Sequence, residues 1–207
     1  MSEPFVVAFV IGVTPNKWAR VWNERMPQLR LDLRPMTRGE AAAGLADGSV
    51  HAAFLRDHES TQAIRLYEEL AVVVAPKEHA VTAFDALSAA DLADETVLAY
   101  DEDSAASVAE LVGANVGVAI MPQSVARAVS RKDVVVRPYT GGESTEVSLV
   151  WSEKTDAVEE LIGIVRGRTA NSSRADEPPV KKLSASQKAA AKKARAAAAK
   201  APAKKKR

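Results

Sequence analysis

Apolar runs and helically spaced apolar residues alternate along the first part of the chain. Residues 5–12 (FVVAFVIG) hold seven apolar residues of eight without alternation, which is typical of a strand buried on both faces. Pro15 follows, and its preset φ and missing donor suit the first position of a helix with Thr14 as the N-cap. Such a junction leaves backbone N–H groups free at the carboxyl end of a sheet, where ligands bind in open α/β folds. A strand–helix unit without a ligand has the same pattern, so both interpretations stay open.

The helix after this junction is followed by a strand of a different kind. Trp18 and Trp22 recur at helical spacing and are expected in the core, and Pro27 is expected to end the helix. Residues 28–34 alternate leucine with charged or polar side chains. This period of two indicates a half-exposed strand, which fits the edge of a sheet.

A capping box introduces the next helix. Thr37 and Glu40 have the required spacing, an alanine-rich helix follows them, and Gly48 closes it. Residues 50–55 then form a third strand. The β-α-β-α-β pattern predicts a parallel sheet with right-handed crossovers, and a buried first strand beside an edge strand fits the order 2-1-3 of a doubly wound sheet.

The rest of the folded part is expected to be a mixture of shorter elements. Strands are expected over residues 70–75, 96–100, 116–120, 134–139 and 146–151, the last two joined across a Gly141–Gly142 turn. Helices are expected at Ser88 and over residues 101–112, 122–129 and 155–166.

Charge divides the chain into an acidic body and a basic arm. Residues 168–207 contain 13 of the 28 Lys and Arg residues but only 2 of the 27 Asp and Glu residues, although the net charge of the whole chain is +1. The arm has little apolar surface to bury and no apolar stripe, so we predict that it is disordered. The chain has no cysteine, which excludes disulfides and thiolate metal sites and favours a cytoplasmic location. Its first apolar run is too short to cross a bilayer, so no membrane partner is expected.

Several motifs, in this order along the chain, resemble one family. They are IGV followed by TP, the alternating second strand, LADGSVHAAFL, YEELAVVVAPKEHAV and ELVGANVGVAIMPQSVA. Over residues 5 to about 166 they resemble the effector-binding domain of LysR-type transcriptional regulators. The resemblance implies a two-lobed α/β fold like that of type 2 periplasmic binding proteins, with doubly wound sheets, two crossover strands and a small effector in the cleft.

The resemblance also implies domain limits. Residues 1–167 would be the LysR-like domain, with lobe I at about 1–75 and 121–167 and lobe II at about 76–120. The chain departs from the family in two ways. It begins at the first strand of the effector domain, without the N-terminal helix-turn-helix of these regulators, and its second lobe is short.

Three residues match effector-binding positions of the family. Thr14 and Thr37 stand where the family places hydroxyl groups that contact the effector, and Arg56 follows the third strand. The resemblance implies that they bind a small anionic effector such as a carboxylate, which helix N-termini and a guanidinium would favour. In the alternative interpretation both threonines only cap helices, and Arg56 pairs with Asp57 or Glu59 on the surface.

No motif indicates an enzyme, a cofactor or a metal site. His51, His58 and His79 lack metal-ligand spacing, and no nucleophile elbow or phosphate-binding loop is present. The acidic run at residues 101–103 is interpreted as a solvated helix N-terminus, which the helix dipole favours.

The sequence therefore predicts an effector-binding module that acts in transcriptional regulation, with a homodimer implied by the resemblance. The alternative is a nucleoid-associated protein that binds DNA or RNA without sequence preference through its arm, since the arm lacks aromatic residues for base stacking. A third interpretation is partner docking at the edge strand near residues 29–34. The candidate nucleic-acid-binding residues are Lys192, Lys193, Arg195, Lys200, Lys204, Lys205, Lys206 and Arg207.

Overall fold

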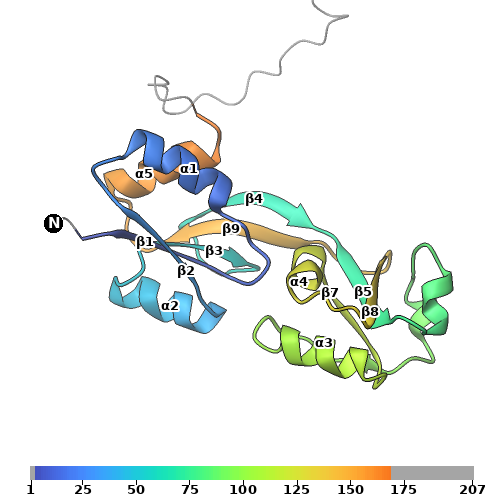
Figure 1. Cartoon of the computed structure of the whole chain (residues 1–207). Helices are drawn as coiled ribbons and strands as arrows, with labels where there is room; N and C mark the ends of the chain where they lie inside the picture. Colours follow the sequence, from blue (N-terminus) through green and yellow to red (C-terminus); the bar gives the residue numbers. More distant parts are fainter. Residues whose placement is uncertain (1–2, 169–207) are drawn as a thin grey trace, which may run out of the picture. The chain divides into compact units, whose positions relative to one another are not determined.

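The computed structural model describes residues 3–168, which form two β-sheets with helices on their faces (Figure 1). The strands are β1 (Phe5–Phe9), β2 (Leu31–Pro35), β3 (Ala52–Arg56), β4 (Ala63–Glu69), β5 (Ala71–Pro76), β6 (Val97–Leu98), β7 (Val118–Pro122), β8 (Val134–Pro138) and β9 (Thr145–Trp151). The helices are α1 (Asn16–Arg25), α2 (Arg38–Asp47), α3 (Ala105–Gly113), α4 (Gln123–Ala128) and α5 (Asp156–Val165), with 3-10 helices η1 (Ala80–Ala83) and η2 (Ala90–Leu92). None of the helices within residues 3–168 is long and apolar enough to cross a membrane.

The first sheet has the strand order β2-β1-β3-β9-β4. Strand β1 pairs in parallel with β2 and β3, so the predicted order 2-1-3 and the edge position of the second strand are confirmed. Helices α1 and α5 cover one face of this sheet and α2 covers the other (Figure 1). Trp22 stacks on Phe5 with 4.8 Å between ring centroids, and Trp18 stacks on Phe54 at 4.9 Å. Both tryptophans belong to the core, as their helical spacing predicts.

One strand of the first sheet, β9, runs opposite to the other four. Strand β9 lies between β3 and β4 and is antiparallel to both. The sequence pattern does not predict β4, because its residues are mostly half-buried and its register shifts between Arg65 and Tyr67. A bulge of this kind interrupts the alternation that would mark a strand.

The second sheet has the order β6-β7-β5-β8. Helices α3 and α4 pack on one face of it, where Val108 and Val125 meet Val72. The segment with η1 and η2 packs on the other face and contributes Val81 and Leu92. A short sheet with both faces covered explains why β5 and β7 are almost continuously apolar.

Sheet membership differs from the expected lobe limits. Residues 70–75 and 121–139 were assigned to the first lobe by resemblance, but β5, α4 and β8 belong to the second sheet. The reason is that strands β4 and β5 are separated only by Leu70, so the chain changes sheets there rather than after Pro76.

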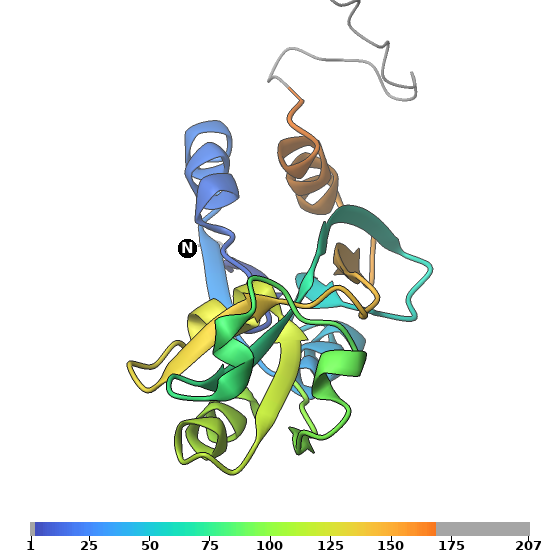
Figure 2. The same ribbon diagram turned by 90° about the vertical axis from the view of Figure 1, so that its right-hand side faces the viewer.

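The connection between β8 and β9 runs beside the connection between β4 and β5. The two strands expected on either side of Gly141–Gly142 are present, but β8 and β9 belong to different sheets, so this turn lies in a crossover. The backbone N–H of Tyr139 donates to the carbonyl of Ala71 at 3.1 Å, and Figure 2 shows the two connections from a second direction. The two crossover strands implied by the resemblance are thus present. From residue 169 on, the basic arm and its candidate nucleic-acid-binding residues lie outside the described residues.

Candidate functional site

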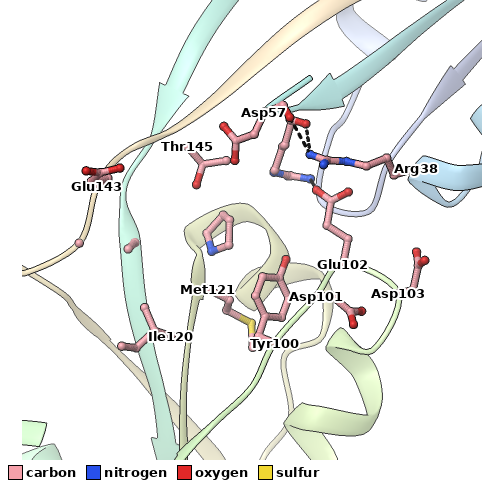
Figure 3. Close-up of a pocket in the computed structure, with 14 residues that line it drawn as sticks. Arg38, Asp57, Tyr100, Asp101, Glu102, Asp103, Ile120, Met121, Glu143 and Thr145 are labelled. Carbon is pink, nitrogen blue, oxygen red and sulfur yellow. Dashed lines mark hydrogen bonds and ion pairs between the residues drawn. The ribbon is translucent and has the colours of Figure 1, made fainter. Parts of the chain in front are cut away.

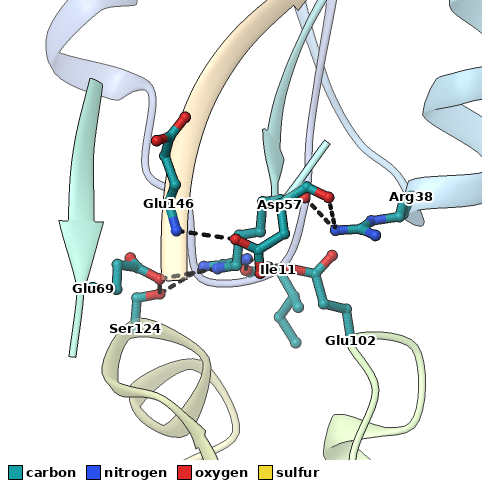
Figure 4. Close-up of polar contacts among 8 residues, drawn as sticks. Ile11, Arg38, Asp57, Glu69, Glu102, Ser124 and Glu146 are labelled. Atoms are coloured by element: carbon teal, nitrogen blue, oxygen red, sulfur yellow. Dashed lines mark hydrogen bonds and ion pairs between the residues drawn. The ribbon is translucent and has the colours of Figure 1, made fainter. Parts of the chain in front are cut away.

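The guanidinium of Arg56 is the centre of a buried polar network between the two sheets. Figure 4 labels its partners Ile11, Glu69, Glu102 and Ser124. Arg56 ends β3, and only 2% of the residue is exposed. Its Nε donates to Glu69 Oε2 at 2.9 Å, and its Nη1 donates to Glu102 Oε1 at 2.8 Å and to the carbonyl of Ile11 at 2.7 Å. The remaining terminal nitrogen, Nη2, donates to Ser124 Oγ at 2.7 Å.

These partners come from both parts of the fold. Glu69 ends β4 of the first sheet, whereas Glu102 precedes α3 and Ser124 lies in α4, which both pack on the second sheet. Ser124 also donates to Glu69 Oε2 at 2.9 Å. The arginine therefore joins the two sheets directly.

Gly12 allows the two parts to approach closely at this network. Its φ is +83°, and a Cβ at this position would lie 2.7 Å from Ser124 Oγ. Only glycine tolerates both the left-handed backbone and this contact.

The charge of the network is unbalanced. Burial alone lowers the pKa of Arg56, but its contacts with Glu102 and Glu69 outweigh burial and raise the pKa above its usual value. The arginine therefore stays charged. Two carboxylates face one guanidinium, and with both carboxylates ionised the group has a net charge of −1.

A second arginine supports the end of β3. Arg38 donates to the carbonyl of Arg56 and to that of Asp57, the latter at 3.2 Å. Asp57 has a φ of 40°, which is uncommon for a residue other than glycine. Its Oδ1 accepts from the N–H of Glu146 at 3.1 Å, and its own N–H donates to the Glu146 carbonyl. This exchange of hydrogen bonds fixes the turn at the mouth of the site.

A cavity of about 460 Å³ lies beside the network (Figure 3). Its lining is formed by the end of β3, the two crossovers, residues 100–103 and the end of β7. Five acidic residues and two arginines contribute, together with Tyr100, Thr145 and an apolar wall that includes Ile120 and Met121. The volume is in the range of small-molecule sites.

Two buried polar atoms at this cavity have no hydrogen-bond partner among residues 3–168. They are the hydroxyl of Tyr100 and Oε2 of Glu102. Burial, and next the negative charge of Glu102, raise the pKa of the Tyr100 hydroxyl above its ordinary value. The hydroxyl is therefore neutral at pH 7 and available as a donor. Buried polar atoms without partners are rare in folded proteins, and a bound ligand or water is one explanation for them.

The three predicted effector-binding residues do not converge. Arg56 lines the central cavity, but four of its five N–H donors are already engaged. Thr37 lines a second cavity of about 530 Å³, which also contacts Glu102. Its hydroxyl accepts from Glu40 N at 3.1 Å in the predicted capping box. Thr14 is exposed and lines neither cavity.

Two local predictions at these residues are wrong. Helix α1 begins after Pro15, whose carbonyl accepts the first helical hydrogen bonds, and no side chain caps it, so Thr14 is not the N-cap. Arg56 is not paired on the surface with Asp57 or Glu59, because its side chain points inward from a strand that is buried along its whole length.

Sequence reasoning missed Glu69, Ser124 and Tyr100, and assigned Glu102 to a solvated helix end. A charged residue directly beside an apolar strand is the only local signal, since Arg56 ends one such run and Glu69 precedes another. That signal does not show which charges meet, because Glu102 is 46 residues from Arg56 and Ser124 is 68 residues from it.

Two of the three histidines, His51 and His79, have structural partners. The N–H of Val6 donates to His51 Nδ1 at 3.0 Å, and His79 Nε2 lies 3.2 Å from Glu95 Oε2. No group of three or more His, Asp or Glu side chains within the described part of the chain is arranged to hold a metal ion.

Two covered α/β sheets, joined by two crossovers with a cavity at their junction, define a two-lobed domain like those of type 2 periplasmic binding proteins. Residues 16–106 match the family model of the LysR substrate binding domain, which confirms the resemblance carried by the sequence motifs. A comparison with curated protein sequences gave no significant match.

Solved structures share this fold at low sequence identity. A mutant OxyR regulatory domain from Pseudomonas aeruginosa matches with a TM-score of 0.61 and 17% identity, over 80% of this chain and 97% of that one. An H2O2-bound OxyR mutant from Corynebacterium glutamicum matches with a TM-score of 0.65 and 19% identity, over 80% and 66% of the two chains. The effector binding domain of a BenM variant matches with a TM-score of 0.65 and 17% identity, over 80% and 94%.

Proposed function

We propose that this chain binds a small-molecule effector in the central cavity and acts in transcriptional regulation through partner molecules. The observation that carries the proposal is the pair of unpartnered buried atoms, Tyr100 Oη and Glu102 Oε2, at a cavity of about 460 Å³. The similarity to regulatory and effector binding domains supports it. The chain has no cysteine, so its sensing does not use thiol chemistry.

Binding would act through the two crossovers. The cavity is lined from both sheets, so a ligand that contacts both favours one arrangement of the lobes over another. Arg56 already links the two sheets through Glu69 and Glu102. A ligand that binds Glu102 would therefore change the free energy of the contact between the sheets.

The anionic effector predicted from the sequence, with Thr14, Thr37 and Arg56 as its contacts, stays a prediction. So do the homodimer, the cytoplasmic location and the lack of enzymatic activity. An anion at Arg56 would compete with Glu102 and Glu69, since these carboxylates already bind the guanidinium. Carboxylates therefore belong in any ligand screen beside neutral and cationic compounds.

A thermal-shift screen of the full chain against a broad metabolite panel tests the proposal. A ligand at one hundred times its Kd stabilises a protein by about 2.7 kcal/mol, which for a domain of this size raises the Tm by about 5–10 °C. Ala71→Phe places a ring in the cavity and should abolish the shift. The matched variant Ala114→Phe, on an exposed position at the end of α3, should retain it. If no compound stabilises the protein, the proposal is wrong.

The charge division of the chain favours a second function. Non-specific DNA or RNA binding through Lys192, Lys193, Arg195 and the other basic residues of the arm is proposed from sequence alone. If about eight of these charges met phosphates, the log–log salt slope of binding would be about −7. The test compares DNA retention by three proteins: the full chain, a chain ending at Gly167, and a full chain with glutamine at the eight candidate nucleic-acid-binding residues of the arm. Equal retention by all three would show that the arm does not bind DNA.

A further inference from the structure

We infer that the effector of the central cavity carries a protonated amine on an apolar body. This inference rests on the proposed binding function and specifies the class of ligand. Asp57, Asp101, Glu102, Asp103 and Glu143 line the cavity, against two arginines. With all seven side chains ionised, the lining has an excess of three negative charges, so it attracts a cation and repels an anion.

The two arginines do not reverse this preference. Arg56 is buried and directs its donors to two carboxylates, a serine and a carbonyl. Four of its five N–H donors are used in this way, so an anion that takes two hydrogen bonds from Arg56 would have to displace at least one of these partners. Arg38 is exposed, donates to two backbone carbonyls, and stands beside the acidic Asp57.

The unpartnered atoms indicate where the amine would bind. Glu102 Oε2 is an acceptor without a donor among the described residues, while its Oε1 holds Arg56. Oε2 has almost no exposed surface, so the Glu102 carboxylate must turn toward the cavity to reach an ammonium group, which has three donors and no acceptor. Tyr100 lines the same cavity, and its neutral hydroxyl is a further acceptor without a partner within residues 3–168.

The part of the cavity lining that comes from the second sheet is suited to a hydrocarbon body. Ala71, Ile120, Met121 and Pro122 provide apolar surface on the side of the second sheet. A ligand with a short aliphatic chain would bury that chain here, while its charged end lies at Glu102. Inorganic cations lack such a body and are not expected to bind.

Three probes with the same six-carbon chain test the charge preference. Hexylammonium, hexanoate and 1-hexanol are titrated into the full chain by calorimetry and by thermal shift. We expect hexylammonium to bind most tightly. Glu102→Gln should weaken hexylammonium binding about 10- to 100-fold, because hydrogen bonds to charged groups are stronger than those between neutral groups. Glu143→Gln, at an exposed rim position, should weaken it about two- to fivefold.

Controls separate charge from folding. Glu153→Gln removes the same charge from an exposed position outside the cavity and should leave binding unchanged. Because Glu102→Gln also removes a partner of Arg56, the Glu143→Gln variant tests the inference even if Glu102→Gln does not fold. Tighter binding of hexanoate, or equal binding of all three probes, would overturn the cationic class and leave the effector proposal intact. If neither these probes nor any compound of the metabolite panel binds, the effector proposal is wrong as well.

Discussion

Arg56 and Glu102, which are 46 residues apart in the chain, form an ion pair of 2.8 Å between the end of β3 and the loop before α3. Side-chain exposure is 2% for the arginine and 15% for the glutamate. Since Glu69 binds the same guanidinium from the first sheet, one cation holds carboxylates from both parts of the fold. This side chain therefore contributes a direct ionic link between the two sheets.

Replacement of Arg56 by methionine should strongly destabilise the protein. The change leaves Glu69 and Glu102 without their shared cation, and removal of one partner from a buried ion pair costs about 3–5 kcal/mol. Urea unfolding measures the loss. Arg131→Met is the matched control, because Arg131 pairs with Asp133 at the surface, where a pair contributes about 0–1 kcal/mol. Equal losses in the two variants would contradict the role assigned to Arg56.

The two threonines at helix starts should differ in their effect on stability. Thr37→Ala removes the capping box of α2 and should cost about 1 kcal/mol. Thr14→Ala should change the free energy of unfolding by less than about 0.5 kcal/mol, because Thr14 is exposed and does not cap α1. Chemical denaturation of both variants checks this. A larger loss for Thr14→Ala would mean that Thr14 has a contact absent from this structure.

Gly12→Ala should disturb the contact between the two sheets. The variant combines a left-handed backbone with a clash at Ser124, and we expect a loss of at least about 1–3 kcal/mol. Gly48→Ala has a similar φ of +79° but open space around the new Cβ, so its cost should be only about 1–2 kcal/mol. Gly39→Ala, in open space in the first turn of α2, should stabilise the protein by about 0.4–1 kcal/mol. Calorimetric unfolding of the three variants should therefore rank them Gly12, Gly48, Gly39 from most to least destabilised.

Tyr100→Phe should change how stability depends on alkaline pH. An unfolded tyrosine ionises near pH 10, whereas the pKa of Tyr100 in the folded protein is higher because of burial and the charge of Glu102. Above about pH 10 the unfolded state therefore binds fewer protons than the folded state, and the free energy of unfolding falls as the pH rises. The variant has no ionisable group at this position, so it should lose less stability than the wild type between pH 8 and pH 11. At pH 7 it should be as stable or slightly more stable, since it removes a buried hydroxyl that has no partner among the described residues. Parallel loss in both proteins would argue against a buried, neutral Tyr100.

Much of the first sheet follows from local patterns. The uninterrupted apolar run at residues 5–12 predicts a central strand, and the alternation at 28–34 predicts an edge strand, as observed. The capping box of Thr37 and Glu40 needs only neighbouring residues and is present. These features depend on periodicity and on contacts within a few positions, which a single sequence displays directly.

Sheet membership depends on contacts between distant residues. Strands β8 and β9 look like a hairpin, yet β8 pairs with β5 and β9 pairs with β3 and β4. Nothing in the local pattern distinguishes a hairpin turn at Gly141–Gly142 from a crossover, because both need the same turn residues. The packing of each strand on its own sheet makes the choice.

By itself, the sequence determined the class of fold, the order of the first three strands and the capping box of Thr37 and Glu40, because each of these depends on short-range spacing. Only the tertiary structure decided that Arg56 faces inward and that Glu69, Glu102 and Ser124 surround it, from 13, 46 and 68 residues away. The physical reason is that a buried charge must find opposite charge and hydrogen-bond partners wherever the folded chain brings them. Spacing along the chain does not predict those partners. The network and the acidic cavity beside it are therefore visible only in the tertiary structure, where the two sheets are in contact.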